Sequence, residues 1–92
     1  MELSERVIRI FESEGYIDIY EHQDPPGKVY EVHSHPTDQA IFVTDGSITF
    51  VIDGVEKEIT APRRFNIPAN TPRTAVVGPR GMIAIIAEKP FV

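Results

Sequence analysis

Two histidines, His33 and His35, stand one residue apart in a stretch that alternates like a β-strand. Side chains of a strand point alternately to its two faces, so both imidazoles are expected on the same face. Gln39 follows beyond Pro36 and adds a side-chain oxygen. Neutral imidazoles with an oxygen donor are typical of a transition-metal site or of the polar floor of a binding pocket. These three side chains are therefore the first candidates for function.

The composition describes one small domain and narrows the classes of function. Of the 92 residues, 41% are apolar, which is enough for a packed core, and none is cysteine. Disulfides and thiolate metal sites are therefore excluded. Apolar runs are shorter than the roughly 20 residues that a membrane span needs, and the first residues are too charged for a secretory signal. We expect a cytoplasmic protein without a membrane partner.

The charge is negative overall but unevenly distributed. A net charge of −5 argues against nucleic acid as a partner, because nucleic acids bind basic surfaces. Residues 62–80, however, contain arginines and no acid. The arginines are Arg63, Arg64, Arg73 and Arg80. Together they could form a local positive patch that selects a small anion; alternatively, they are scattered over turns and solvated.

A short helix is predicted over residues 1–15. Val7 and Phe11 lie one helical turn apart, which gives the helix one apolar face. Ser4 is the expected N-cap, and Gly15 is a natural end. A helix this short is marginal alone, so it must lie against the rest of the chain or a partner subunit.

From residue 16 onward the pattern changes to β-strands. We count about eight short strands at intervals of eight to twelve residues, a spacing that favours a β-sandwich or barrel. The expected ranges are 16–22, 28–35, 39–44, 47–52, 55–60, 65–67, 73–77 and 82–87. Asp53-Gly54 is the strongest hairpin signal, and Asp45-Gly46 and residues 78–81 are read as turns. The sequence predicts a single all-β domain over residues 16–92.

The spacing of the histidines resembles the first motif of the cupin superfamily. That motif reads Gly, five residues, His-x-His, three or four residues, Glu, six residues, Gly. The chain has Gly27, His33, His35, Gln39 and Gly46 at those positions, and its one departure is Gln for Glu.

The second cupin motif is less complete. It reads Gly, five residues, Pro-x-Gly, two residues, His, three residues, Asn. Pro68 is kept, whereas Pro62, Asn70, Arg73 and Val77 stand at the Gly, Gly, His and Asn positions. The resemblance implies a double-stranded β-helix, the jelly-roll or cupin barrel, with the short helix added at its N-terminus. It also implies a homodimer, because small cupins are commonly dimers.

The resemblance further implies a metal site built from these positions. In metal-binding cupins the two histidines, the Glu and the second-motif His bind one transition metal, which gives His33, His35 and Gln39 as ligands here. Gln39 keeps an oxygen but lacks the charge, and Arg73 cannot ligate because its guanidinium stays protonated. Glu31 shares the strand parity of His33 and is a further candidate ligand. The cofactor implied is a divalent Mn, Fe, Ni, Cu or Zn, although the sequence itself requires none.

An anion site is the interpretation that we favour. An arginine in the metal's place can bind a carboxylate or phosphate through two parallel hydrogen bonds. The histidines and the glutamine would then donate to the same ligand, and aromatic side chains would supply apolar contact. The residues expected to bind the ligand are His33, His35, Gln39, Arg73, Phe50 and Phe65.

Two other functions remain open. The chain could be a metal-dependent enzyme of the dioxygenase or isomerase kind, or a structural module whose cavity is filled by its own side chains. Whether it is an enzyme is left undecided, because no nucleophile or phosphate-binding motif is present. His22 is expected to be exposed at a strand end. The tyrosines Tyr16, Tyr20 and Tyr30 are expected at the surface or an interface.

Overall fold

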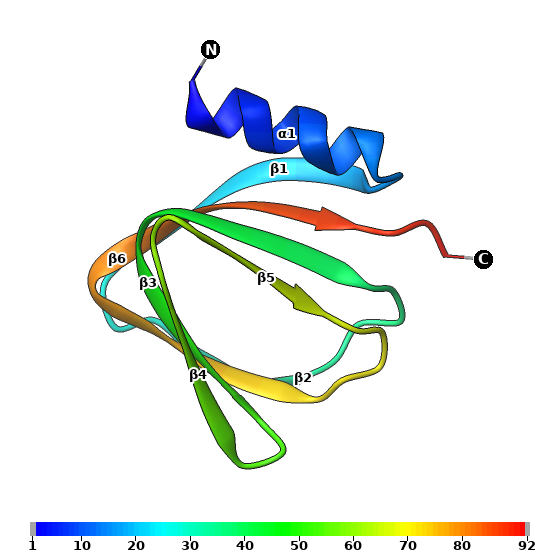
Figure 1. The fold of residues 1–92 in the computed structure, drawn as a ribbon. Helices are drawn as coiled ribbons and strands as arrows, with labels where there is room; N and C mark the ends of the chain where they lie inside the picture. Colours follow the sequence, from blue (N-terminus) through cyan, green and yellow to red (C-terminus); the bar gives the residue numbers. More distant parts are fainter. Residues whose placement is uncertain (1, 92) are drawn as a thin grey trace.

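The computed structural model describes residues 2–91 as one helix lying against a barrel of β-strands (Figure 1). The elements are α1 (Leu3–Ser13), β1 (Ile17–Asp24), β2 (Val29–His33), β3 (Gln39–Ile52), β4 (Val55–Thr60), β5 (Arg63–Ile67) and β6 (Arg73–Glu88). The described helix is neither long nor apolar enough to cross a membrane.

Two long strands, β3 and β6, organise the sheet. β6 pairs with β1, β2 and β3, and β3 also pairs with β4 and β5, all antiparallel. The pairing of β3 with β6 runs from Gln39 opposite Glu88 to Val51 opposite Thr74, so each long strand spans both halves of the barrel. This wrapped antiparallel sheet confirms the predicted double-stranded β-helix.

The prediction of about eight short strands is wrong, because two predicted turns are bends within long strands. Asp45-Gly46 lies within β3 and residues 78–81 lie within β6, where the pairing register shifts on both sides of residues 45–46. Gly46 (φ 73°) and Gly81 (φ 77°) lie where the two backbones approach closely. Glycines let the strands bend and continue there instead of turning. The Asp53-Gly54 hairpin between β3 and β4 is present as predicted, with positive φ at both residues.

The helix begins two residues earlier than its predicted cap would place it. Its N-cap is Glu2, in extended backbone, and Leu3 is the first helical residue. The carbonyl of Glu2 accepts a hydrogen bond from the backbone N–H of Arg6 at 3.2 Å, so helical bonding already includes the turn that contains Ser4. Ser4 is therefore not the N-cap.

Side chains from the barrel hold the helix in place. Arg64 donates two hydrogen bonds to the carboxylate of Glu14, at 2.7 and 2.6 Å, and its guanidinium lies 4.9 Å from the ring centre of Phe11. The pairing with Arg64 lowers the pKa of Glu14. Lys89 donates to the carbonyl of Glu14 and lies over the ring of Tyr16. Of the two surfaces considered for the helix, its own barrel is therefore the one it covers.

Apolar side chains form two clusters on opposite faces of the sheet. The outer cluster lies between α1 and the sheet and contains Val7, Phe11, Tyr16, Ala40, Ile85 and Ala87. The inner cluster fills part of the barrel and contains Ile41, Val43, Ile48, Phe50, Ile59, Ile67, Ala75, Val77, Met82 and Ala84. Neighbouring residues of β3 and β6 thus belong to different clusters, as the two-residue period of a strand requires. The inner cluster leaves the remaining barrel volume for a cavity.

Candidate functional site

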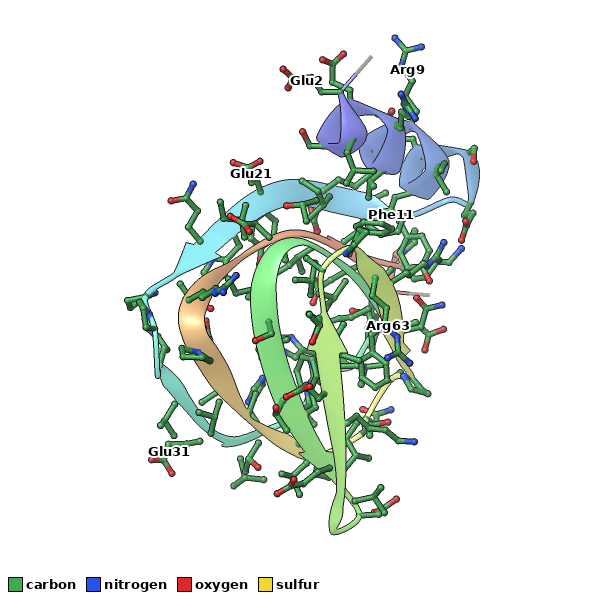
Figure 2. The ribbon with its side chains drawn as sticks, turned by 60° about the vertical axis from the view of Figure 1, so that its left-hand side comes forward. Glu2, Arg9, Phe11, Glu21, Glu31 and Arg63 are labelled. Carbon is green, nitrogen blue, oxygen red and sulfur yellow. The ribbon has the colours of Figure 1, made fainter. Side chains whose placement is uncertain are left out.

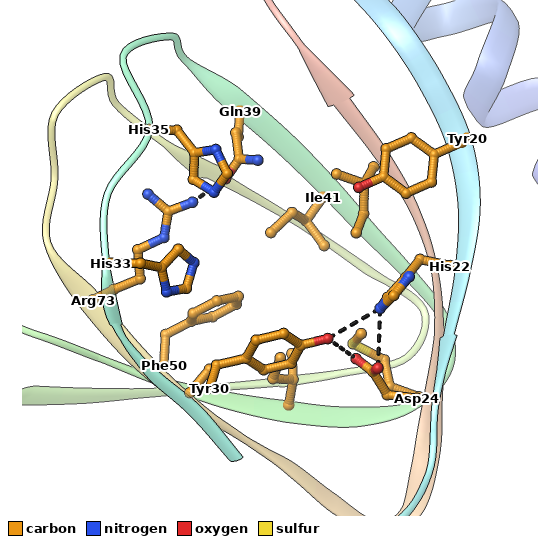
Figure 3. Close-up of a pocket in the computed structure, with 14 residues that line it drawn as sticks. Tyr20, His22, Asp24, Tyr30, His33, His35, Gln39, Ile41, Phe50 and Arg73 are labelled. Atoms are coloured by element: carbon orange, nitrogen blue, oxygen red, sulfur yellow. Dashed lines mark hydrogen bonds and ion pairs between the residues drawn. The ribbon is translucent and has the colours of Figure 1, made fainter. Parts of the chain in front are cut away.

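A cavity of about 230 Å³ lies inside the barrel, with polar side chains at two ends (Figure 3). We call the group of His33, His35, Gln39 and Arg73 the arginine end. The group of His22, Asp24 and Tyr30 is called the tyrosine end. The apolar lining includes Ile41, Ile48, Phe50, Met82 and Ile86, and Tyr20 and Ala75 complete the wall. A mostly apolar wall with a few polar groups is typical of a small-molecule site.

Arg73 is a buried charge with spare hydrogen-bonding capacity. It is 3% exposed at the start of β6. Its Nη2 donates to Oε1 of Gln39, and its Nη1 donates to the carbonyl of Thr71 at 3.2 Å. Its Nε is buried and has no partner. Burial lowers the pKa of Arg73 and Glu88 opposes that shift, but a guanidinium in a protein remains protonated.

Both the oxygen and the nitrogen of the Gln39 side-chain amide are hydrogen-bonded. Its Oε1 accepts from Arg73, and its Nε2 donates to Oε1 of Glu88 at 3.2 Å. Glu88 lies opposite Gln39 in the sheet and was not predicted as a site residue. Its only sequence signal is that it is an acid at the end of the apolar run 82–87. Gln39 therefore orients Arg73 through its oxygen, and its Nε2 has one further N–H beyond the bond to Glu88.

The two predicted histidines face each other across the arginine end, with ring centres 5.3 Å apart. Nδ1 of His33 lies 2.9 Å from the carbonyl of Glu31, and Nδ1 of His35 lies 3.2 Å from the carboxylate of Glu88. Both partners are acceptors, so each Nδ1 carries a proton, and in a neutral ring each Nε2 is an acceptor. Toward a ligand the neutral imidazoles are thus hydrogen-bond acceptors at Nε2, and not the donors that the anion interpretation predicted.

Burial and the nearby Arg73 lower the pKa of His35, and Glu88 only partly opposes them. Between the ordinary histidine pKa of 6.5 and the lower folded value, the unfolded chain binds more protons than the folded one. The contribution of His35 to the free energy of unfolding is therefore complete above that range and is lost as the pH falls through it.

We expect wild type to lose stability more steeply than His35→Gln when the pH is lowered from neutral to about pH 5. Urea unfolding at a series of pH values measures the difference. If the free energies of unfolding of the two proteins change in parallel with pH, the pKa of His35 is not lowered by folding.

The donor set does not fit a divalent metal. Within residues 2–91, no group of three or more His, Cys, Asp or Glu side chains is arranged to hold a metal ion. The oxygen of Gln39 already accepts from Arg73, and the guanidinium would repel a cation at the position of the missing third imidazole. His33 and His35 alone would leave a metal with two protein ligands.

The tyrosine end consists of three side chains that are hydrogen-bonded to one another. The hydroxyl of Tyr30 donates to Oδ2 of Asp24 at 2.6 Å. Nε2 of His22 lies 3.0 Å from Oδ1 of Asp24 and 3.0 Å from the Tyr30 oxygen. Burial and the hydrogen bond to Asp24 raise the pKa of Tyr30, and burial also raises the pKa of Tyr20. Both phenols are therefore protonated at neutral pH.

Two sequence expectations about these residues are wrong. His22 was expected to be exposed and Tyr30 to lie at the surface or an interface, but both are partly buried and line the cavity. Tyr16, which was also expected at the surface or an interface, is buried in the outer cluster. Tyr20 is half exposed, as expected, and it also lines the cavity. Tyr20, His22 and Asp24 alternate along β1, and this two-residue period was the signal that could have placed them together.

Glu31 lies outside the cavity, contrary to the prediction from strand parity. It is exposed, and Figure 2 shows it pointing away from the barrel. The register of β2 shifts between Tyr30 and His33, so both of these residues face the cavity although they lie three positions apart. Such an irregularity reverses the parity that the prediction assumed.

Of the two aromatic residues predicted to contact a ligand, one lines the cavity and the other does not. Phe50 lines the cavity as expected. Phe65 does not line it and instead stacks on Phe50, with ring centres 5.4 Å apart. Phe65 therefore supports the wall from behind.

The four arginines between residues 62 and 80 do not form one patch. Arg64 is paired with Glu14, and Arg63 and Arg80 are exposed. Only Arg73 of the four lines the cavity. The positive charge available to a ligand is thus a single buried guanidinium.

The comparisons with known proteins identify the family. The family model described as Cupin domain matches residues 20–78, which is more than half of the chain. The chain is a cupin. This cupin matches no curated protein.

Solved structures share the fold of this cupin. An RmlC-like cupin from Shewanella frigidimarina NCIMB 400 is 30% identical, with a TM-score of 0.69 over 79% of this chain and 65% of that one. DMSP lyase DddQ from Ruegeria pomeroyi DSS-3 is 20% identical, with a TM-score of 0.72 over 80% of this chain and 38% of the lyase. KdgF from Halomonas sp. is 17% identical, with a TM-score of 0.62 over 87% and 90% of the two chains. At these identities, the lyase and KdgF show the fold alone.

Proposed function

We propose that this cupin binds a small carboxylate in the barrel cavity, with Arg73 as its anchor. The observation that carries the proposal is the charge of Arg73, which is buried in the cavity wall with one donor, Nε, that has no hydrogen-bond partner. Leaving a buried donor unpaired costs about 1–3 kcal/mol, and more when the donor is charged. An anion in the cavity would compensate the charge of this guanidinium and could accept hydrogen bonds from it.

The charges around Arg73 are compatible with an anion. Glu88 is not among the residues that line the cavity, because it lies behind Gln39 and His35 and pairs with both. The charge presented to a ligand at this end is therefore the positive charge of Arg73.

The two histidines indicate which kind of carboxylate would fit the arginine end. Because Nε2 of each neutral imidazole accepts hydrogen bonds, His33 and His35 favour a donor beside the carboxylate. A hydroxyl on the neighbouring carbon would provide that donor. The ligand class that best matches the arginine end is therefore an α-hydroxycarboxylate.

Titration calorimetry on the wild-type protein tests this proposal. The probes are short carboxylates with and without an α-hydroxyl, and inorganic phosphate. We expect α-hydroxycarboxylates to bind more tightly than the matched plain carboxylates. If none of these anions binds, the proposal is overturned.

A metal-dependent enzyme is the competing proposal, supported by one observation. His33 and His35 each have Nδ1 held by an acceptor, as second-shell groups hold the histidines of metal sites. Elemental analysis of protein purified without a histidine tag tests it. Stoichiometric Mn, Fe, Ni, Cu or Zn that is lost in His33→Ala and His35→Ala would favour the enzyme.

The substitution Arg73→His should create a metal site. It removes the repelling charge, adds a third imidazole and frees the oxygen of Gln39. We expect Zn²⁺ affinity to rise by about 100-fold or more, measured by competition with a chelating dye. Unchanged weak binding would show that residue 73 does not occupy the ligand position.

A further inference from the structure

The tyrosine end has no role in the function proposed so far, although it contains a buried and hydrogen-bonded carboxylate that lines the cavity. The Asp24 side chain is 3% exposed and lines the cavity, and both of its oxygens are held by hydrogen bonds. Burying a carboxylate is unfavourable unless it is paired. Among the residues that line the cavity, the only arginine or lysine is Arg73, which belongs to the other end.

The hydrogen-bonding capacity of this end is almost entirely accepting. The single O–H of Tyr30 is used on Asp24, so its oxygen can only accept further bonds. Nε2 of His22 lies between two acceptors, the Asp24 carboxylate and the Tyr30 oxygen. An ionised carboxylate has about four acceptor positions, and His22 and Tyr30 occupy two of them. The end is thus complementary to a hydrogen-bond donor.

We propose that His22, Asp24 and Tyr30 form a second subsite that binds a donor group, and an ammonium in preference to a hydroxyl. The buried negative charge of Asp24 and the aromatic rings of Tyr20 and Tyr30 at the same end favour a cation. Figure 3 shows this cluster across the cavity from Arg73, with apolar side chains between the two ends.

This subsite deepens the function proposed above and rests on it for the identity of the other half of the ligand. A molecule that spans the cavity has a carboxylate at Arg73, an apolar middle and an ammonium at Asp24. The ligand class is an amino acid whose amine and carboxylate lie at opposite ends.

The experiment compares α-hydroxycarboxylates that differ only in their far end, which carries a methyl, a hydroxyl or an ammonium group. A series of increasing chain length is titrated into wild type, Asp24→Asn and Tyr30→Phe. The control is Glu58→Gln, which removes a charge from exposed β4. In wild type we expect the ammonium probe to bind about tenfold or more tightly than the methyl probe of the same length.

Asp24→Asn should reduce that preference to within about twofold, whereas Tyr30→Phe, which keeps the carboxylate but removes the phenol oxygen, should reduce it in part. Both variants should leave the affinity of the methyl probe unchanged. A merely structural role would weaken all probes alike. Equal affinity of wild type for the three probes at every length would overturn the subsite. Tyr30→Phe keeps the carboxylate and serves if Asp24→Asn does not fold.

Probes that lack one end separate the two proposals. If methyl-ended carboxylates do not bind wild type, the anchor role of Arg73 fails, and simple alkylamines then test the subsite alone. Alkylamine binding that is lost in Asp24→Asn or weakened in Tyr30→Phe would support the subsite, and the absence of alkylamine binding in wild type would overturn it.

Discussion

Replacing Arg73 with glutamine is expected to weaken the binding of an α-hydroxycarboxylate by about 100-fold, which corresponds to roughly 2.7 kcal/mol. The substitution removes the charge and the donors of a guanidinium that lines the cavity, while an amide still fills part of the space. Arg73→Lys should give an intermediate loss, because it keeps the charge but cannot bind a carboxylate through a planar pair of bonds. Titration calorimetry at low and high salt measures both.

The matched control is Arg80→Gln, which removes an exposed arginine from the same strand. The control should bind as wild type does. Equal affinity of Arg73→Gln and wild type, with folding verified by circular dichroism, would show that the guanidinium does not contact the ligand.

Replacing Gly46 with alanine is expected to cost more than about 4 kcal/mol of the free energy of unfolding. Its φ of 73° is unfavourable for alanine by about 1–2 kcal/mol. A Cβ there would also lie 2.8 Å from the carbonyl carbon of Gly81 and closer still to its oxygen, and neither backbone atom can move alone. For a domain of this size we expect the melting temperature to fall by about 15 °C or more.

Gly54→Ala separates the two causes of that loss. Gly54 has nearly the same φ, 74°, but a Cβ there would meet nothing within 4 Å. Only the backbone cost of about 1–2 kcal/mol remains, and the melting temperature should fall by about 4–16 °C. Similar losses in the two variants would show that the approach of the strands at Gly46 and Gly81 is not tight.

The sequence predicted the arginine end because motif spacing and strand geometry agree there. The His33–His35 pair shares a face by period alone, and the second motif aligned Arg73 with a ligand position far along the chain. Sheet pairing places His33 opposite Arg73 and Gln39 opposite Glu88, which brings these groups together. The all-β barrel, the hairpin at Asp53-Gly54 and the N-terminal helix were likewise accessible from local patterns.

The other features depend on tertiary contacts that local patterns do not contain. Glycine signals at 45–46 and 78–81 were read as turns, and only the pairing of β3 with β6 shows that the chain bends and continues. The irregularity in β2 reverses the parity of Glu31. The tyrosine end was missed because His22 and Asp24 come from β1 and Tyr30 comes from β2. Neither strand alone suggests a site.

The shared hydrogen bond between Gln39 and Arg73 also has an evolutionary consequence. Regaining the usual metal-binding residues would take two substitutions, and their order would matter. Arg73→His made first releases the glutamine oxygen from the guanidinium that now holds it. Gln39→Glu made first would place a second carboxylate between Arg73 and Glu88. That carboxylate would form an ion pair with the Arg73 guanidinium and would keep the arginine in place. A lineage descending from this protein would therefore reach metal chemistry more easily by changing residue 73 before residue 39.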